Sequence, residues 1–94
     1  MRLSNTAWTK VGGDAPTSII IQNNGSSVVL VTLAASLPGS AKLPYAGVAN
    51  ADHIECLRLS GGSEPIKLEP DGMNVYARVY GADAAKSDLS FIEG

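Results

Sequence analysis

Hydrophobic and polar residues alternate with a period of two along much of this chain, a pattern typical of half-buried β-strands. Two such segments, 17–23 and 27–33, are rich in β-branched residues and flank the dipeptide Asn24-Gly25. Asn-Gly suits a turn that needs positive φ at both central positions. This arrangement therefore predicts a β-hairpin with a two-residue loop.

Five further segments have the same character and complete the predicted strands: 8–11, 53–59, 65–69, 73–80 and 88–92. Gly, Pro or Asp residues interrupt the pattern between most of them, as expected for turns. Short strands separated by turns predict an all-β fold. The specific prediction is a two-sheet antiparallel β-sandwich of about seven short strands, with Ig-like or jelly-roll connectivity.

The length of the chain suits one folded unit. A sequence of 94 residues lies in the usual range for a single domain, so we assign 1–94 to one β-sandwich domain. Its pattern breaks at about 34–52, which is long for a connection within a small domain. We interpret this segment either as a Greek-key crossover between sheets or as an arm that packs on a neighbouring molecule.

The predicted hairpin is apolar on both of its sides. A small sandwich normally buries one face of each sheet, so the runs 19–21 and 28–31 need a second cover or become an aggregation hazard. We therefore predict that copies of the chain associate, using one side of the hairpin and the long connection. The predicted interface residues are Ile20, Val29, Val31, Leu37, Leu43 and Tyr45.

Charge and cysteine content exclude several kinds of partner. Seven Lys and Arg against nine Asp and Glu give a formal net charge of −2, so no overall positive field attracts nucleic acid or an anionic membrane. Cys56 is the single cysteine and cannot form an internal disulfide. The N-terminus lacks the apolar stretch of a signal peptide, and no run approaches the roughly 20 residues of a membrane span. We expect synthesis in a cytoplasm.

Residues for catalysis or metal binding are sparse. His53 is the only histidine, and Cys56 follows it by three positions, so the two side chains point to opposite faces of a strand. Asp52, His53 and Glu55 form a local cluster of ligand types, but two ligands on one strand face do not complete a zinc site. We predict no catalytic residue, no cofactor and no metal, the alternative being a site completed by symmetry-related copies.

One strand carries residues suited to binding. Tyr76, Arg78 and Tyr80 share one parity of the segment 73–80 and are predicted to face outward, where aromatic rings and a guanidinium favour protein interfaces or sugar stacking. The alternative is cross-strand packing on a solvated face. Trp8 is interpreted either as a core anchor or as a further ligand platform.

Three stretches, 8–12, 19–25 and 66–78, together resemble small β-sandwich proteins of tailed bacteriophages. They read Trp-Thr-Lys-Val-Gly, Ile-Ile-Ile-Gln-Asn-Asn-Gly and Ile-Lys-Leu-Glu-Pro-Asp-Gly-Met-Asn-Val-Tyr-Ala-Arg. The resemblance implies a virion component, expected to be a capsid decoration or cementing protein that assembles in the host cytoplasm. Its implied partners are further copies of itself, with a trimer favoured, and the major capsid protein.

Two other functions remain open at this point. The first alternative to decoration is a carbohydrate-binding or host-adhesion module that uses four aromatic residues as stacking platforms, Trp8, Tyr45, Tyr76 and Tyr80. The second alternative is a neck or tail accessory protein. The first alternative requires clustered, solvent-facing rings. The second differs from decoration only in its location on the virion.

Overall fold

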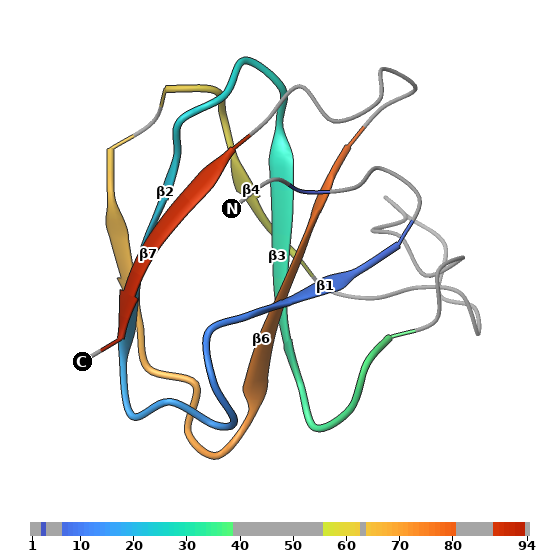
Figure 1. Ribbon diagram of the computed structural model, residues 1–94, viewed down its shortest axis with the longest axis vertical. Coiled ribbons are helices and arrows are strands. Elements are labelled where there is room, and N and C mark those ends of the chain that lie inside the picture. The colour runs from blue at the N-terminus through green and yellow to red at the C-terminus, as the bar shows by residue number, and fades with distance from the viewer. Residues whose placement is uncertain (1–2, 4–6, 39–55, 63, 81–87, 94) are drawn as a thin grey trace.

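Two antiparallel β-sheets packed face to face contain all the regular structure of the described residues (Figure 1). The computed structural model describes residues 3, 7–38, 56–62, 64–80 and 88–93. The strands are β1 (Thr9–Val11), β2 (Ile19–Asn23), β3 (Val29–Ala34), β4 (Leu57–Leu59), β5 (Ile66–Leu68), β6 (Asn74–Val79) and β7 (Leu89–Glu93). One sheet has the order β1-β6-β3-β4, and the other has the order β5-β2-β7. The predicted all-β sandwich of seven strands is confirmed.

Of the two predicted connectivities, the strand order is that of a jelly roll without its first strand, and only the central pairs match an immunoglobulin domain. The pairs β2–β5 and β3–β6 correspond to the B–E and C–F pairs of an immunoglobulin domain. In that domain the first strand lies beside the second, and the last strand lies beside the sixth. Here β1 pairs with β6, β4 pairs with β3 and β7 pairs with β2, so three strands lie in the other sheet than they do in an immunoglobulin domain.

The predicted hairpin between β2 and β3 is wrong, because these strands belong to different sheets. Neither Asn24 nor Gly25 has the positive φ that the predicted turn requires. The five residues 24–28 instead cross between the sheets, which pack about 10 Å apart and are within reach of such a segment. β2 and β3 lie in facing sheets, and each strand presents one apolar side to the space between them. Packing of the two sheets therefore buries the apolar side of each strand.

A fully buried asparagine holds this crossing in place. The Asn23 side-chain nitrogen donates hydrogen bonds to the carbonyl oxygens of Ser27 at 2.7 Å and Leu59 at 3.0 Å. Its side-chain oxygen accepts one from the amide of Gly25 at 3.0 Å. Leu59 lies in β4 of the opposite sheet, so this one side chain joins the two sheets as well as closing the turn.

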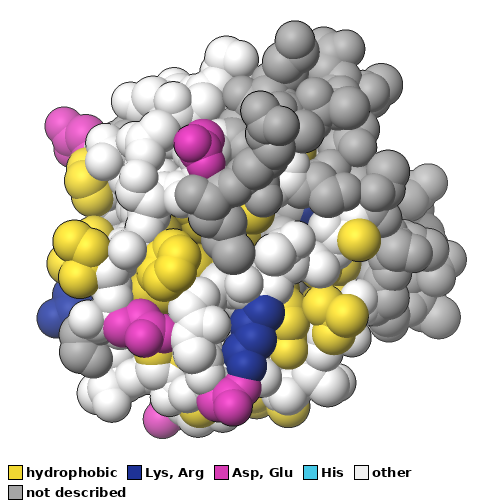
Figure 2. Space-filling view, in the orientation of Figure 1, with side chains coloured by type: hydrophobic (Ala, Val, Ile, Leu, Met, Phe, Trp, Pro, Cys, Tyr) yellow, Lys and Arg dark blue, Asp and Glu magenta, His cyan; other side chains and the backbone are white. Residues whose placement is uncertain are grey.

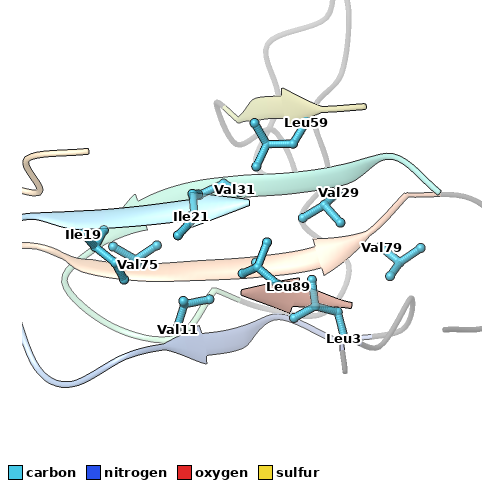
Figure 3. Close-up of a cluster of buried hydrophobic side chains, with 11 residues drawn as sticks. Leu3, Val11, Ile19, Ile21, Val29, Val31, Leu59, Val75, Val79 and Leu89 are labelled. Carbon is cyan, nitrogen blue, oxygen red and sulfur yellow. The ribbon is translucent and has the colours of Figure 1, made fainter. Parts of the chain in front are cut away.

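The space between the sheets is filled by aliphatic side chains (Figure 3). Ile19 and Ile21 are fully buried from one sheet, and Val29 and Val31 are buried from the other. The prediction that Val29 and Val31 belong to an intermolecular surface is therefore wrong. Burying a side chain of this size contributes about 1.5–3 kcal/mol, so these positions stabilise the fold itself.

A turn at Pro70-Asp71-Gly72, between the predicted strands 65–69 and 73–80, joins the two sheets. Asp71 and Gly72 have φ values of 53° and 85°, and the amide of Met73 donates to the carbonyl oxygen of Pro70 at 3.2 Å. Positive φ at two consecutive positions is typical of a type I′ turn. The turn leads from β5 into β6 and places the Asp71 carboxylate at one end of the sandwich.

Candidate partner-binding surfaces

The outer face of the four-stranded sheet is a second hydrophobic cluster rather than an open binding face. Trp8, Leu30 and Tyr76 form this cluster and are at most 4% exposed. Arg78 is 5% exposed, and its guanidinium carbon lies 5.6 Å from the centre of the Trp8 ring. Tyr76 and Arg78 lie on the outer face of the sheet, as predicted. The prediction that they are exposed is wrong. Trp8 is a core anchor.

Burial on this face also shifts the pKa values of two side chains. Desolvation lowers the pKa of the Arg78 guanidinium below its ordinary value, and the nearby Cys56 thiol partly offsets this effect. Desolvation raises the pKa of the Cys56 thiol to about 11, although Arg58 and Arg78 act in the opposite direction. Cys56 packs against the Trp8 cluster as a partly buried residue, as expected for a small apolar side chain.

The raised pKa of Cys56 predicts slow alkylation. Since the pKa stands about two above the ordinary value of 9.0, the fraction of thiolate at pH 8 is about 100-fold lower than for an ordinary thiol. We expect the rate of iodoacetamide labelling to keep rising between pH 9 and pH 11 in the folded protein. The denatured chain serves as the control and is expected to reach half of its maximal rate near pH 9 and to level off above about pH 10. A folded protein whose labelling rate levels off at the same pH as that of the denatured chain would contradict the buried position.

Tyr80 is the one member of the predicted binding face that is exposed. Its ring is 45% exposed just beyond the end of β6. The guanidinium carbon of the exposed Arg58, in β4, lies 5.3 Å from the centre of this ring. The pair forms a cation–π contact at the surface.

The outer face of the three-stranded sheet carries the clearest exposed apolar group. Ile20 and Ile92 are direct cross-strand partners, 41% and 69% exposed, and Phe91 beside them is 38% exposed. We refer to Ile20 and Ile92 as the Ile20–Ile92 face. Phe91 pairs with the buried Ile21, so its side chain lies on the opposite side of β7, exposed at the edge of the sheet. A shallow hollow of about 110 Å³ lies between their strands. Figure 2 shows hydrophobic side chains on the side of the molecule where Figure 1 places this sheet.

The predicted interface residues therefore divide into three groups. Ile20 and Leu37 are exposed, the latter at 62%, whereas Val29 and Val31 are in the core. Leu43 and Tyr45 lie outside the described residues, as does most of the long connection 34–52.

Sequence reasoning missed Phe91 and Ile92 as surface residues. Their adjacency was the available signal, because two consecutive apolar residues in a strand place one side chain on each face.

A larger apolar opening lies between the sheets, beside β4 and β5. It has a volume of about 480 Å³ and is bordered by Leu33 and Leu57, which are 40% and 44% exposed, and by Leu68. These side chains belong to the inner faces of the sheets. The opening is where the sandwich is least tightly closed among its described strands.

Ligand-binding chemistry is limited in the described part of the chain. Within residues 3, 7–38, 56–62, 64–80 and 88–93, no three His, Cys, Asp or Glu side chains are grouped so as to hold a metal ion. The candidate ligands Asp52, His53 and Glu55 lie outside these ranges. The same ranges contain no helix long and apolar enough to cross a membrane.

Comparisons with known proteins identify no relative of this chain. No protein-family model, no curated protein and no solved structure matches it.

Proposed function

We propose that this chain is a non-enzymatic structural protein of a bacteriophage virion, which decorates or cements the capsid as a homo-oligomer bound to the assembled head. The observation that carries the self-association is the Ile20–Ile92 face. Single exposed apolar residues are common on protein surfaces, but here two exposed isoleucines are direct cross-strand partners on one face of the sheet. Removing these side chains from water is the main source of favourable free energy for association on this surface.

The position of these residues favours another protein chain as the cover. Ile92 and Phe91 belong to β7, an edge strand of its sheet, and residues 89–92 carry no charge. Charged side chains, proline or a covering element normally protect an exposed edge strand from pairing with another chain. Glu93, the last residue of β7, is its one charged residue, and an edge strand that is otherwise uncharged beside an exposed apolar pair suits contact with a second copy.

The assignment to a virion rests on the sequence resemblance, with which a small β-sandwich is compatible. A decoration protein that binds only the assembled lattice stabilises the shell by mass action. The sugar-binding alternative is less well supported, because Trp8 and Tyr76 are at most 4% exposed and cannot offer a ring face to a glycan. The major capsid protein is the proposed second partner.

Serine substitutions on the Ile20–Ile92 face test the self-association. We expect Ile20→Ser and Ile92→Ser each to raise the concentration for half-assembly about tenfold or more, since an interface hot spot contributes more than about 1.4 kcal/mol. Sedimentation velocity is the measurement. Leu33→Ser is the matched control, because Leu33 is 40% exposed but lies in β3 of the other sheet. A monomeric wild type, or isoleucine variants that assemble normally, would refute the proposed association.

Co-sedimentation with phage heads tests the proposed cementing role. Wild-type protein is expected to co-sediment with assembled heads and not with free subunits of the major capsid protein encoded with it. Equal binding to heads and free subunits would contradict the cementing role. Cryo-EM of the virions would then show whether the density lies on the capsid, the neck or the tail.

A further inference from the structure

The two ends of strand β6 carry opposite and complementary chemistry. β6 runs from the turn at Pro70–Gly72 to Tyr80, so these features lie at opposite ends of the strand (Figure 1). At the Tyr80 end, the exposed Arg58 guanidinium is held over the Tyr80 ring. Arg58 makes no ion pair within the described parts of the chain. A cation fixed in this way is already oriented for a partner carboxylate.

A hollow with two carboxylate side chains lies at the other end. Its volume is about 520 Å³, and it is lined by Ala15, Pro16, Thr17, Glu69, Asp71 and Gly72. Glu69 and Asp71 are exposed, and neither is in an ion pair with a described Lys or Arg. The type I′ turn described above sets the position of Asp71. The hollow is therefore acidic and large enough for a side chain.

The acidic hollow lies at the end of the three-stranded sheet that is nearer to the Ile20–Ile92 face. Thr17 lies just before β2 and Glu69 directly follows β5, while Ile20 pairs across these two strands with Lys67. The same margin of the three-stranded sheet thus combines an apolar area with carboxylates. The Arg58–Tyr80 pair, on the other sheet, offers an aromatic ring with a cation.

We propose that copies of this chain associate head to tail, with the Arg58–Tyr80 pair of one copy docked at the Glu69–Asp71 hollow of the next. This inference rests on the proposed self-association and specifies its geometry. The guanidinium donates to the two carboxylates, a pairing for which its planar fork is suited. The interface is heterologous, because the two contacting patches differ. A heterologous interface forms a ring where the rotation between copies closes and an open filament where it does not. A ring agrees with the cyclic trimer expected from the sequence resemblance.

Complementary variants test the polarity of this interface. Arg58→Ala removes the donor side, and the double variant Glu69→Gln, Asp71→Asn removes the acceptor side. Asn tolerates the positive φ of residue 71, so both variants are expected to fold, as circular dichroism will verify. We expect each variant alone to require an at least tenfold higher concentration for assembly. Glu64→Gln, which removes another exposed carboxylate outside the hollow, is the matched control and is expected to assemble like wild type.

Mixing the two defective variants gives the sharper result. A head-to-tail interface predicts that an equimolar mixture forms 1:1 dimers and stops there, because one intact donor meets one intact acceptor. Native mass spectrometry would detect this heterodimer. An assembled wild type whose Arg58 and Glu69/Asp71 variants also assemble normally, or variants whose mixture stays monomeric, would overturn the head-to-tail interface and leave the proposed self-association standing. A wild type that is monomeric throughout would overturn both.

Discussion

Replacing Trp8 with alanine is expected to lower the free energy of unfolding by about 3–5 kcal/mol, the usual cost of truncating a buried tryptophan. Trp8 is 4% exposed, packs with Leu30 and Tyr76, and supports the Arg78 guanidinium on its ring. The substitution leaves a cavity and removes the cation–π contact. Because small domains have a stability of only about 5–15 kcal/mol, the substitution would remove a large part of the free energy of unfolding.

Urea unfolding followed by far-UV circular dichroism measures this effect without relying on tryptophan fluorescence. Tyr80→Ala is the matched control, because Tyr80 is an aromatic residue on the same sheet that is 45% exposed. Its expected cost is below about 1 kcal/mol. A cost below about 1 kcal/mol for Trp8→Ala would show that Trp8 lies at an open ligand platform and would restore the sugar-binding alternative.

Replacing Asn23 with alanine is the second large expected effect, at about 2–4 kcal/mol. Its side chain makes three hydrogen bonds, with Ser27, Leu59 and Gly25, and each unsatisfied buried group left behind costs about 1–3 kcal/mol. The effect extends beyond local turn stability because the bond to Leu59 joins the two sheets.

The neighbouring asparagine provides the control for this second experiment. Asn24 bonds through its side chain to the Ser90 hydroxyl in an exposed position, so Asn24→Ala is expected to cost about 0.5 kcal/mol or less. Chemical denaturation of both variants gives the comparison. Equal costs at the two positions would show that the buried network does not hold the crossing between the sheets.

The strands were predictable because their signals are local. Each of the seven strands overlaps a segment with period-two alternation, and the turn at Pro70-Asp71-Gly72 followed from its residue types. Pairing was not predictable in the same way. The runs at 19–21 and 28–31 are apolar on both sides, so they fit a hairpin or two facing sheets equally well from the sequence, and the choice depends on long-range contacts such as that between Asn23 and Leu59.

Exposure was the second property that local pattern did not determine. The alternation of side chains along the strand correctly assigned Tyr76 and Arg78 to the outer face of their sheet. Alternation does not determine whether other side chains cover that face. Both are buried, whereas Tyr80, with the same parity, is exposed. The expectation that an uncovered ribbon forces association therefore loses its support at Val29 and Val31. Self-association now depends on Ile20 and the previously overlooked Ile92.

Amide hydrogen exchange as a function of protein concentration tests the central claim, self-association through the margin of the three-stranded sheet, most directly. Peptides covering 89–93 and 69–72 are expected to exchange more slowly at concentrations where the protein assembles than in dilute solution. Peptides from the interior of β6 should exchange equally at both concentrations, since its residues are already buried within one copy. Exchange of 89–93 that does not change with concentration in an assembled sample would contradict the account.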